Sequence, residues 1–229
     1  MLMKMERTNF LNCDEEEQEI KASSQRIYLN NVQDYSFSMV AIIKFIDRHA
    51  GNLACNFLSI FNLQKNAEIK KFDKILAVQL WGIGETILTL PAIDALRKKF
   101  PKADFDVLAT ARNKDVYYKN RNISNIIEID LNPFSVINFI LKNIKKYDLV
   151  IDMEEYLNVS AIIAFFAGKR IVGYSHNSRA KLYTDRVRYN DKQHAMQTFL
   201  DLARALDVVY DTNRLPKLNF SKNDKNFVE

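Results

Sequence analysis

The sequence contains few glycines, prolines, cysteines and histidines. Its 229 residues include only 5 Gly and 4 Pro, too few for a collagen-like chain or a loop-rich all-β protein. The 2 cysteines, Cys13 and Cys55, lie far apart and outside any C-x-x-C pair, so they predict neither a disulfide framework nor a zinc site. The 3 histidines lack the H-E-x-x-H spacing. A metal centre is therefore not expected.

Long uncharged hydrophobic runs are also missing. The first residues, 1–7, are polar and lead into no apolar stretch of signal-peptide length. The most apolar early segment, residues 39–63, contains Lys44, Asp47, Arg48 and His49, whereas a spanning helix needs about 20 nearly uncharged residues. These features predict a cytoplasmic protein.

The balance of charge is mildly basic, with a net charge of +5 and a pI near 9.0. Such a balance favours anionic partners, such as phosphates, nucleic acid or acidic lipid, without choosing among them. A basic solvated surface explains it equally well. With 15 Phe and 10 Tyr, the chain has ample material for a core.

The first third of the chain predicts a leader and then a helix. Residues 1–35 contain the acidic run 14–19 and little to bury, which predicts a disordered acidic leader. Residues 36–71 are predicted to hold an amphipathic helix and a linker, because apolar residues recur with helical period over 39–63. The helix could lie on a membrane surface or cover the domain that follows. Its few cations favour packing against the domain.

Residues 72–210 alternate short apolar strands with helices. Strands are expected at 75–78, 105–109, 126–129, 149–151 and 170–172, and helices at 86–99, 114–119, 134–143, 159–167 and 194–206, the last capped by Asp191. Continuous apolar strands between helices indicate an α/β fold with a doubly wound, parallel, Rossmann-like sheet. Because ligands bind beyond the carboxyl ends of such strands, residues 79–85, 110–114, 152–155 and 174–188 are expected to border one cleft.

The turn after the first strand, residues 79–85, is the most informative segment. Gly82 and Gly84 allow a tight turn and a close ligand approach, and the next helix offers unpaired N–H groups. As a dinucleotide motif the turn is weak, because Ile87 replaces the third glycine, and no P-loop lysine follows. Glu85 either complements the helix dipole or acts as a general base. Position alone favours neither interpretation.

Residues 74–97, KILAVQLWGIGETILTLPAIDALR, resemble the opening of glycosyltransferase family nine, the ADP-heptose lipopolysaccharide heptosyltransferases. There an apolar strand and a short turn lead to Gly-Asp, then Thr-Leu-Pro-Ala and a helix ending in Phe-Pro. Residues 100–108, 147–152, 167–174 and 182–184 are similar to later family segments in the same order. The resemblance spans roughly residues 40–218.

The resemblance implies the N-terminal half of a GT-B fold, which has two Rossmann-like domains. The first binds the acceptor, and the second binds most of the nucleotide-diphosphate sugar. Transfer would invert the anomeric centre, with no metal and no cofactor beyond the donor. Glu85 stands where the family has Asp, the same charge on a longer arm, as the catalytic base. The expected substrate-binding residues are Trp81, Gly82, Gly84, Thr86, Arg112, Asp152 and Arg179.

The sequence ends at Glu229, where the second domain of that family should begin. Residues 211–229 are therefore expected to start an interdomain linker, and the chain is expected to be inactive without a C-terminal domain. The implied partners are that domain and an anionic glycolipid or oligosaccharide acceptor, with peripheral contact at the inner face of the membrane and no nucleic acid. Two alternatives stay open: a non-catalytic binding module (a remnant or split-gene half), and a nucleotide-binding Rossmann enzyme.

Overall fold

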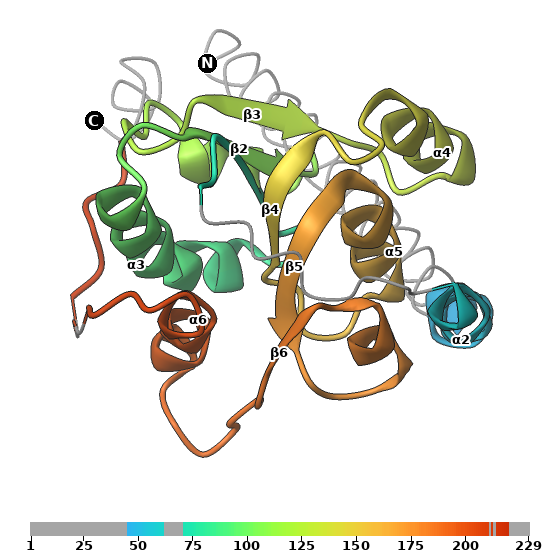
Figure 1. Ribbon diagram of the computed structural model, residues 1–229. Helices are drawn as coiled ribbons and strands as arrows, with labels where there is room; N and C mark the ends of the chain where they lie inside the picture. The colour runs from blue at the N-terminus through green and yellow to red at the C-terminus, as the bar shows by residue number, and fades with distance from the viewer. Residues whose placement is uncertain (1–44, 62–70, 211, 213, 220–229) are drawn as a thin grey trace, which may run out of the picture. The chain divides into compact units, whose positions relative to one another are not determined.

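The structure is a computed structural model that describes residues 45–61, 71–210, 212 and 214–219 (Figure 1). The predicted leader, residues 1–35, lies outside the described residues. The chain divides into two compact units, Met1–Ile46 and Asp47–Glu229. The sheet and the helices that cover it belong to the second unit. None of the helices that the structure describes is long and apolar enough to span a membrane.

Six parallel strands form the sheet, in the order β3-β2-β1-β4-β5-β6. This confirms the predicted α/β class and the doubly wound, Rossmann-like sheet. The inner strands are buried on both faces, which explains why they read as continuous apolar runs. The strands are β1 (Lys74–Val78), β2 (Asp104–Ala109), β3 (Asn125–Glu128), β4 (Tyr147–Asp152), β5 (Gly168–Tyr174) and β6 (Asp185–Val187). The last was not predicted.

Helices cover both faces of this sheet (Figure 1). Because side chains alternate along a strand, Ile75 and Ala77 of β1 pack with α3 (Ile83–Lys99) and α6 (Ala195–Arg204). Leu76 and Val78 pack with α4 (Pro133–Lys142) and α5 (Asn158–Ala167). Short helical turns complete the chain, namely η1 (Asp47–Gly51), η2 (Lys114–Tyr117) and η3 (Ser178–Leu182).

Two helix starts differ from the prediction. Helix α3 begins at Ile83, three residues before the expected start at residue 86, and it continues through Pro91. The cap of α6 is His194, whose Nδ1 accepts a hydrogen bond from the backbone N–H of Met196 at 3.2 Å. The prediction of Asp191 as the cap is wrong, because the helix begins only at Ala195.

Helix α2 (Asn52–Ile60) packs onto the domain through the buried Cys55 and the partly buried Leu58. In η1, the Asp47 carboxylate accepts hydrogen bonds from the backbone N–H groups of Asn158 at 2.7 Å and Val159 at 2.8 Å. It thereby caps α5, which has no side-chain cap of its own. The expected apolar stripe instead points outward, since Leu53 is 72% and Phe57 60% exposed. The side of α2 that carries Cys55 and Leu58 packs inward.

We expect Asp47→Ala to lower the free energy of unfolding by about 1–2 kcal/mol, because it leaves two buried helix N–H groups without an acceptor. Urea unfolding of the full chain measures this. Asp191→Ala is the matched control, because Asp191 caps no helix and a change of at most about 0.5 kcal/mol is expected there. Equal effects of the two substitutions would contradict the capping role of Asp47.

Candidate functional site

Strand β1 lies at the centre of the sheet, between β2 and β4. Its register pairs Val78 with Leu108 of β2 on one side and with Asp152 of β4 on the other. The strand order reverses between β1 and β4, and in open parallel sheets ligands bind at this point, beyond the carboxyl ends of the strands. The turn with Gly82 and Gly84 follows β1 directly, so the fold places it at this edge.

Gly82 has a φ of 77°, in the left-handed region that favours glycine. The Glu85 side chain folds back over it, because a Cβ at position 82 would lie 3.0 Å from the Glu85 Cδ atom and collide with its Oε2. Glu85 itself is exposed, in the first turn of α3. Its carboxylate therefore lies at the surface, beside the turn and the positive end of the helix.

Gly84 differs from Gly82, because the protein's own packing does not require it. A Cβ at position 84 would meet no atom within 4 Å. Glycine inside a helix costs about 1 kcal/mol relative to alanine. The open space beside its backbone is what a ligand close to the helix terminus requires.

The buried side chain of Asn113 holds the turn from the β2 side. Its Nδ2 donates to the carbonyl oxygen of Gln79 at 2.8 Å and to the Thr86 hydroxyl at 2.9 Å. Its Oδ1 accepts from the backbone N–H of Thr110 at 2.9 Å. Thr86 is itself buried and donates to the Gly82 carbonyl at 2.6 Å. The Thr86 side chain thus bonds to other protein groups inside the turn. Asn113 was not among the site residues predicted from the sequence.

On the β4 side the turn is held by Glu154, which is only 4% exposed. Its Oε1 accepts hydrogen bonds from the backbone N–H groups of Leu80 at 2.5 Å and Trp81 at 2.7 Å. Burial raises the pKa of the Glu154 carboxyl to about 8, and the Asp152 charge adds to this, although the two N–H groups and Arg179 lower it. The sequence reasoning did not select Glu154, although residues 152–155 are visibly rich in acid.

A buried ion pair lies below the same edge. Arg179 and Asp152 both have fully buried side chains, and the Arg179 Nη2 lies 2.7 Å from the Asp152 Oδ2. The hydroxyl groups of Tyr183, at 2.7 Å, and Ser160, at 3.0 Å, donate to the same carboxylate oxygen. This network ties η3 and α5 to the end of β4. Arg179 therefore lies inside the domain, although it was expected on the rim.

At the surface, Arg112 stacks on Trp81. Its guanidinium carbon lies 4.7 Å from the centroid of the Trp81 ring, and Arg112 is exposed while Trp81 is half-buried. Such a contact contributes about 0.5–1 kcal/mol at exposed sites. Of the eight predicted site residues, Trp81, Gly82, Gly84, Glu85 and Arg112 lie at or near the surface, and Thr86, Asp152 and Arg179 lie below it.

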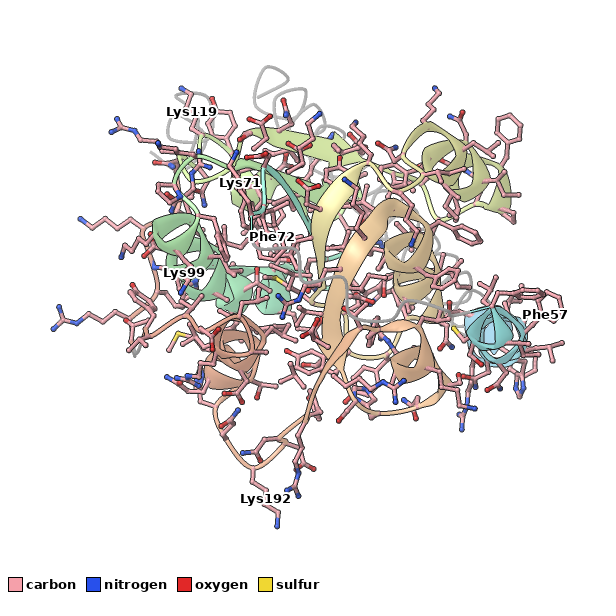
Figure 2. All side chains as sticks on the ribbon, viewed as in Figure 1. Phe57, Lys71, Phe72, Lys99, Lys119 and Lys192 are labelled. Carbon is pink, nitrogen blue, oxygen red and sulfur yellow. The ribbon has the colours of Figure 1, made fainter. Side chains whose placement is uncertain are left out.

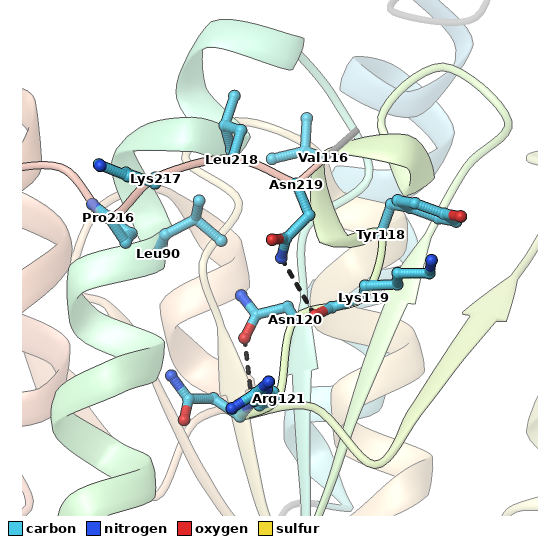
Figure 3. Close-up of a pocket in the computed structure, with 11 residues that line it drawn as sticks. Leu90, Val116, Tyr118, Lys119, Asn120, Arg121, Pro216, Lys217, Leu218 and Asn219 are labelled. Carbon is cyan, nitrogen blue, oxygen red and sulfur yellow. Dashed lines mark hydrogen bonds between the residues drawn. The ribbon is translucent and has the colours of Figure 1, made fainter. Parts of the chain in front are cut away.

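A pocket of about 230 Å³ lies elsewhere on the domain (Figure 3). Leu90 of α3, Val116 of η2, the loop of residues 118–122 and residues 216–219 line it. The Asn219 Nδ2 donates to the carbonyl oxygen of Lys119 at 3.1 Å across this pocket. It contains none of the predicted site residues, so the candidate site rests on the geometry of the turn after β1.

Comparison with known proteins gives a family match over part of the chain and a shared fold. Residues 141–227 match Glycosyltransferase family 9 (heptosyltransferase), a segment that includes Asp152 and Arg179 but not the turn with Glu85. We found no match among curated proteins.

Three solved structures share the fold at low sequence identity. The glycosyl transferase family 9 from Veillonella parvula DSM 2008 is 20% identical, with a TM-score of 0.58 over 67% of this chain and 46% of that one. E. coli heptosyltransferase WaaC with ADP-2-deoxy-2-fluoro heptose is 19% identical, with a TM-score of 0.54 over 62% and 50%. E. coli ADP-heptose lps heptosyltransferase II is 18% identical, with a TM-score of 0.54 over 67% and 49%. The chain spans about half the length of these proteins.

The raised pKa of Glu154 predicts a pH-dependent stability. The folded domain keeps a proton up to a pH of about 8, whereas the carboxyl of the unfolded chain loses it near 4.5. Stability therefore falls as the pH rises through this window, by at most about 1.4 kcal/mol per pH unit. Glu154→Gln keeps an acceptor for Leu80 and Trp81 but cannot ionise, so it removes most of this fall.

Urea unfolding at pH 5 and pH 8 tests this expectation. Glu128→Gln, at an exposed position on β3, is the matched control and should keep the pH dependence of the unsubstituted chain. If Glu154→Gln showed the same fall in stability as the unsubstituted chain, the proton would belong to another group.

Proposed function

We propose that this chain, whose residues 141–227 match Glycosyltransferase family 9 (heptosyltransferase), supplies the acceptor-binding half of a GT-B sugar transferase. A second Rossmann-like domain would bind the donor, a nucleotide-diphosphate sugar. The solved WaaC structure carries ADP-2-deoxy-2-fluoro heptose, which favours an ADP-heptose donor. The proposed acceptor is an anionic glycolipid or oligosaccharide of the lipopolysaccharide type, and the proposed site of action is the cytoplasmic side of the membrane.

The observation that carries this proposal is the exposed Glu85 carboxylate in the first turn of α3, at the edge where β1 and β4 diverge. A helix N-terminus favours the ionised form of a nearby carboxylate. Glu85 accepts the proton of the acceptor hydroxyl while that oxygen attacks the anomeric carbon of the donor. Attack opposite the departing diphosphate inverts this centre. The proposed step uses no metal.

The neighbouring groups have supporting roles in this mechanism. Trp81 and the Arg112 guanidinium stacked on it form one wall of the proposed acceptor site, and Arg112 binds the phosphate or carboxylate groups of the acceptor. The backbone at Gly84 leaves room for the acceptor. Asp152 and Arg179 act from below, because their network fixes the wall of the site. Thr86 fixes the turn.

Glu85→Gln tests the role of the base. The assay combines this chain with a donor-binding Rossmann-like domain, ADP-heptose and a lipopolysaccharide-type acceptor, and it measures sugar transfer. We expect kcat to fall by roughly 10²–10⁴-fold with little change in the acceptor KM, because glutamine keeps the shape but accepts no proton. Glu85→Asp, which keeps the charge, should retain more activity than Glu85→Gln.

Near-full transfer by Glu85→Gln would remove Glu85 from the mechanism. Acceptor binding by the unsubstituted chain with no transfer, under conditions where the donor domain binds its nucleotide sugar, would instead favour a non-catalytic binding module.

Gly84→Ala separates ligand binding from stability. Because nothing in the protein contacts a Cβ at position 84, we expect equal or higher stability, by up to about 1 kcal/mol. Acceptor binding should weaken about tenfold or more, since a methyl group displaces the acceptor. Calorimetric titration and urea unfolding measure the two effects.

Gly82→Ala is the contrasting variant, because the positive φ of Gly82 predicts a loss of about 1–2 kcal/mol in stability. Unchanged acceptor binding in Gly84→Ala would contradict a ligand at this terminus.

A further inference from the structure

The pocket of Figure 3 lies beside the middle of α3. Its volume is about 230 Å³, just below the range of about 300–1,000 Å³ that is typical of sites for drug-sized ligands. Leu90 of α3 and Val116 of η2 contribute to the lining, and two other segments, residues 118–122 and 216–219, complete it (Figure 3). The pocket therefore has room for a small organic molecule.

The charged residues that line this pocket are all basic. They are Lys119 and Arg121 of the loop 118–122 and Lys217 of the C-terminal segment, and no acidic residue lines the pocket. All three are exposed, and they lie on different sides of it (Figure 3). Within the part of the chain that the structure describes, none of the three forms a salt bridge. The pocket therefore favours an anion.

The acidic residues next to the lining do not neutralise these cations. Asp94 of α3 accepts hydrogen bonds from the Asn122 Nδ2 at 3.2 Å and the Tyr210 hydroxyl at 3.0 Å. Its carboxylate also lies 2.8 Å from the Nζ of Lys98, on the same helix. Asp115 of η2 is exposed and does not line the pocket. The charge of Asp94 is thus already balanced by its own partners.

Amide and apolar groups form the rest of the lining. Asn120, Asn122 and Asn219 carry side-chain amides, and each amide offers two donors and one acceptor, which suits hydroxyl groups. Leu90 and Leu218 offer apolar surface to a carbon skeleton. This combination of cations, amides and a small apolar area is complementary to a phosphate group carried on a hydroxylated carbon chain or ring.

The loop and the C-terminal segment are bonded to each other at the pocket. Lys119 has a left-handed backbone, with a φ of 51°, which is uncommon for a residue with a side chain and is found more often at binding sites. Its carbonyl oxygen accepts a hydrogen bond from the Asn219 Nδ2 at 3.1 Å (Figure 3). The backbone N–H of Asn120 donates to the Tyr117 carbonyl at 3.0 Å. The two segments therefore form one wall.

We propose that this pocket binds a small hydroxylated organic phosphate, a molecule with one phosphate group on a short polyol or a monosaccharide. Arg121 and Lys217 bind the phosphate, because a guanidinium and a mobile ammonium group both form charge-assisted hydrogen bonds with it. The asparagine amides bind the hydroxyl groups, and the carbon skeleton lies against Leu90. Inorganic phosphate satisfies the cations alone and therefore binds more weakly.

This binding site does not depend on the sugar-transfer proposal, because none of the predicted site residues lines the pocket. A bound ligand contacts the loop 118–122 and residues 216–219 at the same time. It therefore fastens the C-terminal segment to the domain. Because the sequence predicts that residues 211–229 begin an interdomain linker, the ligand would restrict the movement of that linker.

Calorimetric titration of the full chain tests the proposal. The probes are glycerol 3-phosphate, ribose 5-phosphate and glucose 6-phosphate, with inorganic phosphate and glucose as references. We expect at least one of the three organic phosphates to bind with a Kd below about 1 mM and at least about tenfold more tightly than inorganic phosphate. Glucose, which lacks the charge, should show no saturable binding.

Arg121→Gln/Lys217→Gln removes two of the cations and should weaken binding of the organic phosphate at least about tenfold. Lys102→Gln/Lys192→Gln is the matched control, because it removes the same charge at exposed positions outside the pocket. Lys192 lies at the opposite end of the domain from Lys119 (Figure 2). Circular dichroism and thermal unfolding confirm that each variant is folded.

Hydrogen exchange locates the ligand, since the backbone amides of residues 118–122 and 216–219 should exchange more slowly when it is bound. The proposal is overturned if none of the three organic phosphates binds more tightly than inorganic phosphate, or if exchange in both segments is unchanged. It is also overturned if the control variant weakens binding as much as Arg121→Gln/Lys217→Gln. Glu85→Gln should bind the organic phosphate normally, which separates failure of this site from failure of sugar transfer.

Discussion

The hydrogen bonds from the backbone N–H groups of Leu80 and Trp81 to the buried Glu154 carboxyl hold the candidate site together. They join the ends of β1 and β4 where the strand order reverses. Asn113 holds the same turn from the β2 side. The left-handed conformation of Gly82 and the start of α3 lie between these two anchors, so the position of Glu85 depends on both.

Buried polar groups serve as connectors throughout this side of the domain. The Asp152–Arg179 pair joins β4 to η3, and Asp47 joins η1 to α5. Removing one member would leave a buried charge or N–H group without a partner, which costs more than the pair contributes.

Most of the sheet could be predicted, because the strands around β1 and β4 are short apolar runs between helices, which is a local signal. Strand β6 was missed, since Asp185-Arg186-Val187 at the sheet edge is short and polar. Glu85, Gly82 and Gly84 could be selected because the strand, the turn and the helix start are contiguous in sequence. Glu154 could not, because it lies 74 residues from Leu80, and no local pattern pairs them.

The sequence by itself determined the order of strands and helices, the tight turn after β1 and the acidic residue in the first turn of α3, because each depends on neighbours along the chain. The tertiary structure decided which charged residues are buried and which face of α2 points outward. Arg179 reads as a surface cation until Asp152, 27 residues away, supplies its partner. The apolar pattern of α2 does not identify its inward face, because Cys55 and the preceding Asp47 bond to Asn158 of α5, more than 100 residues away.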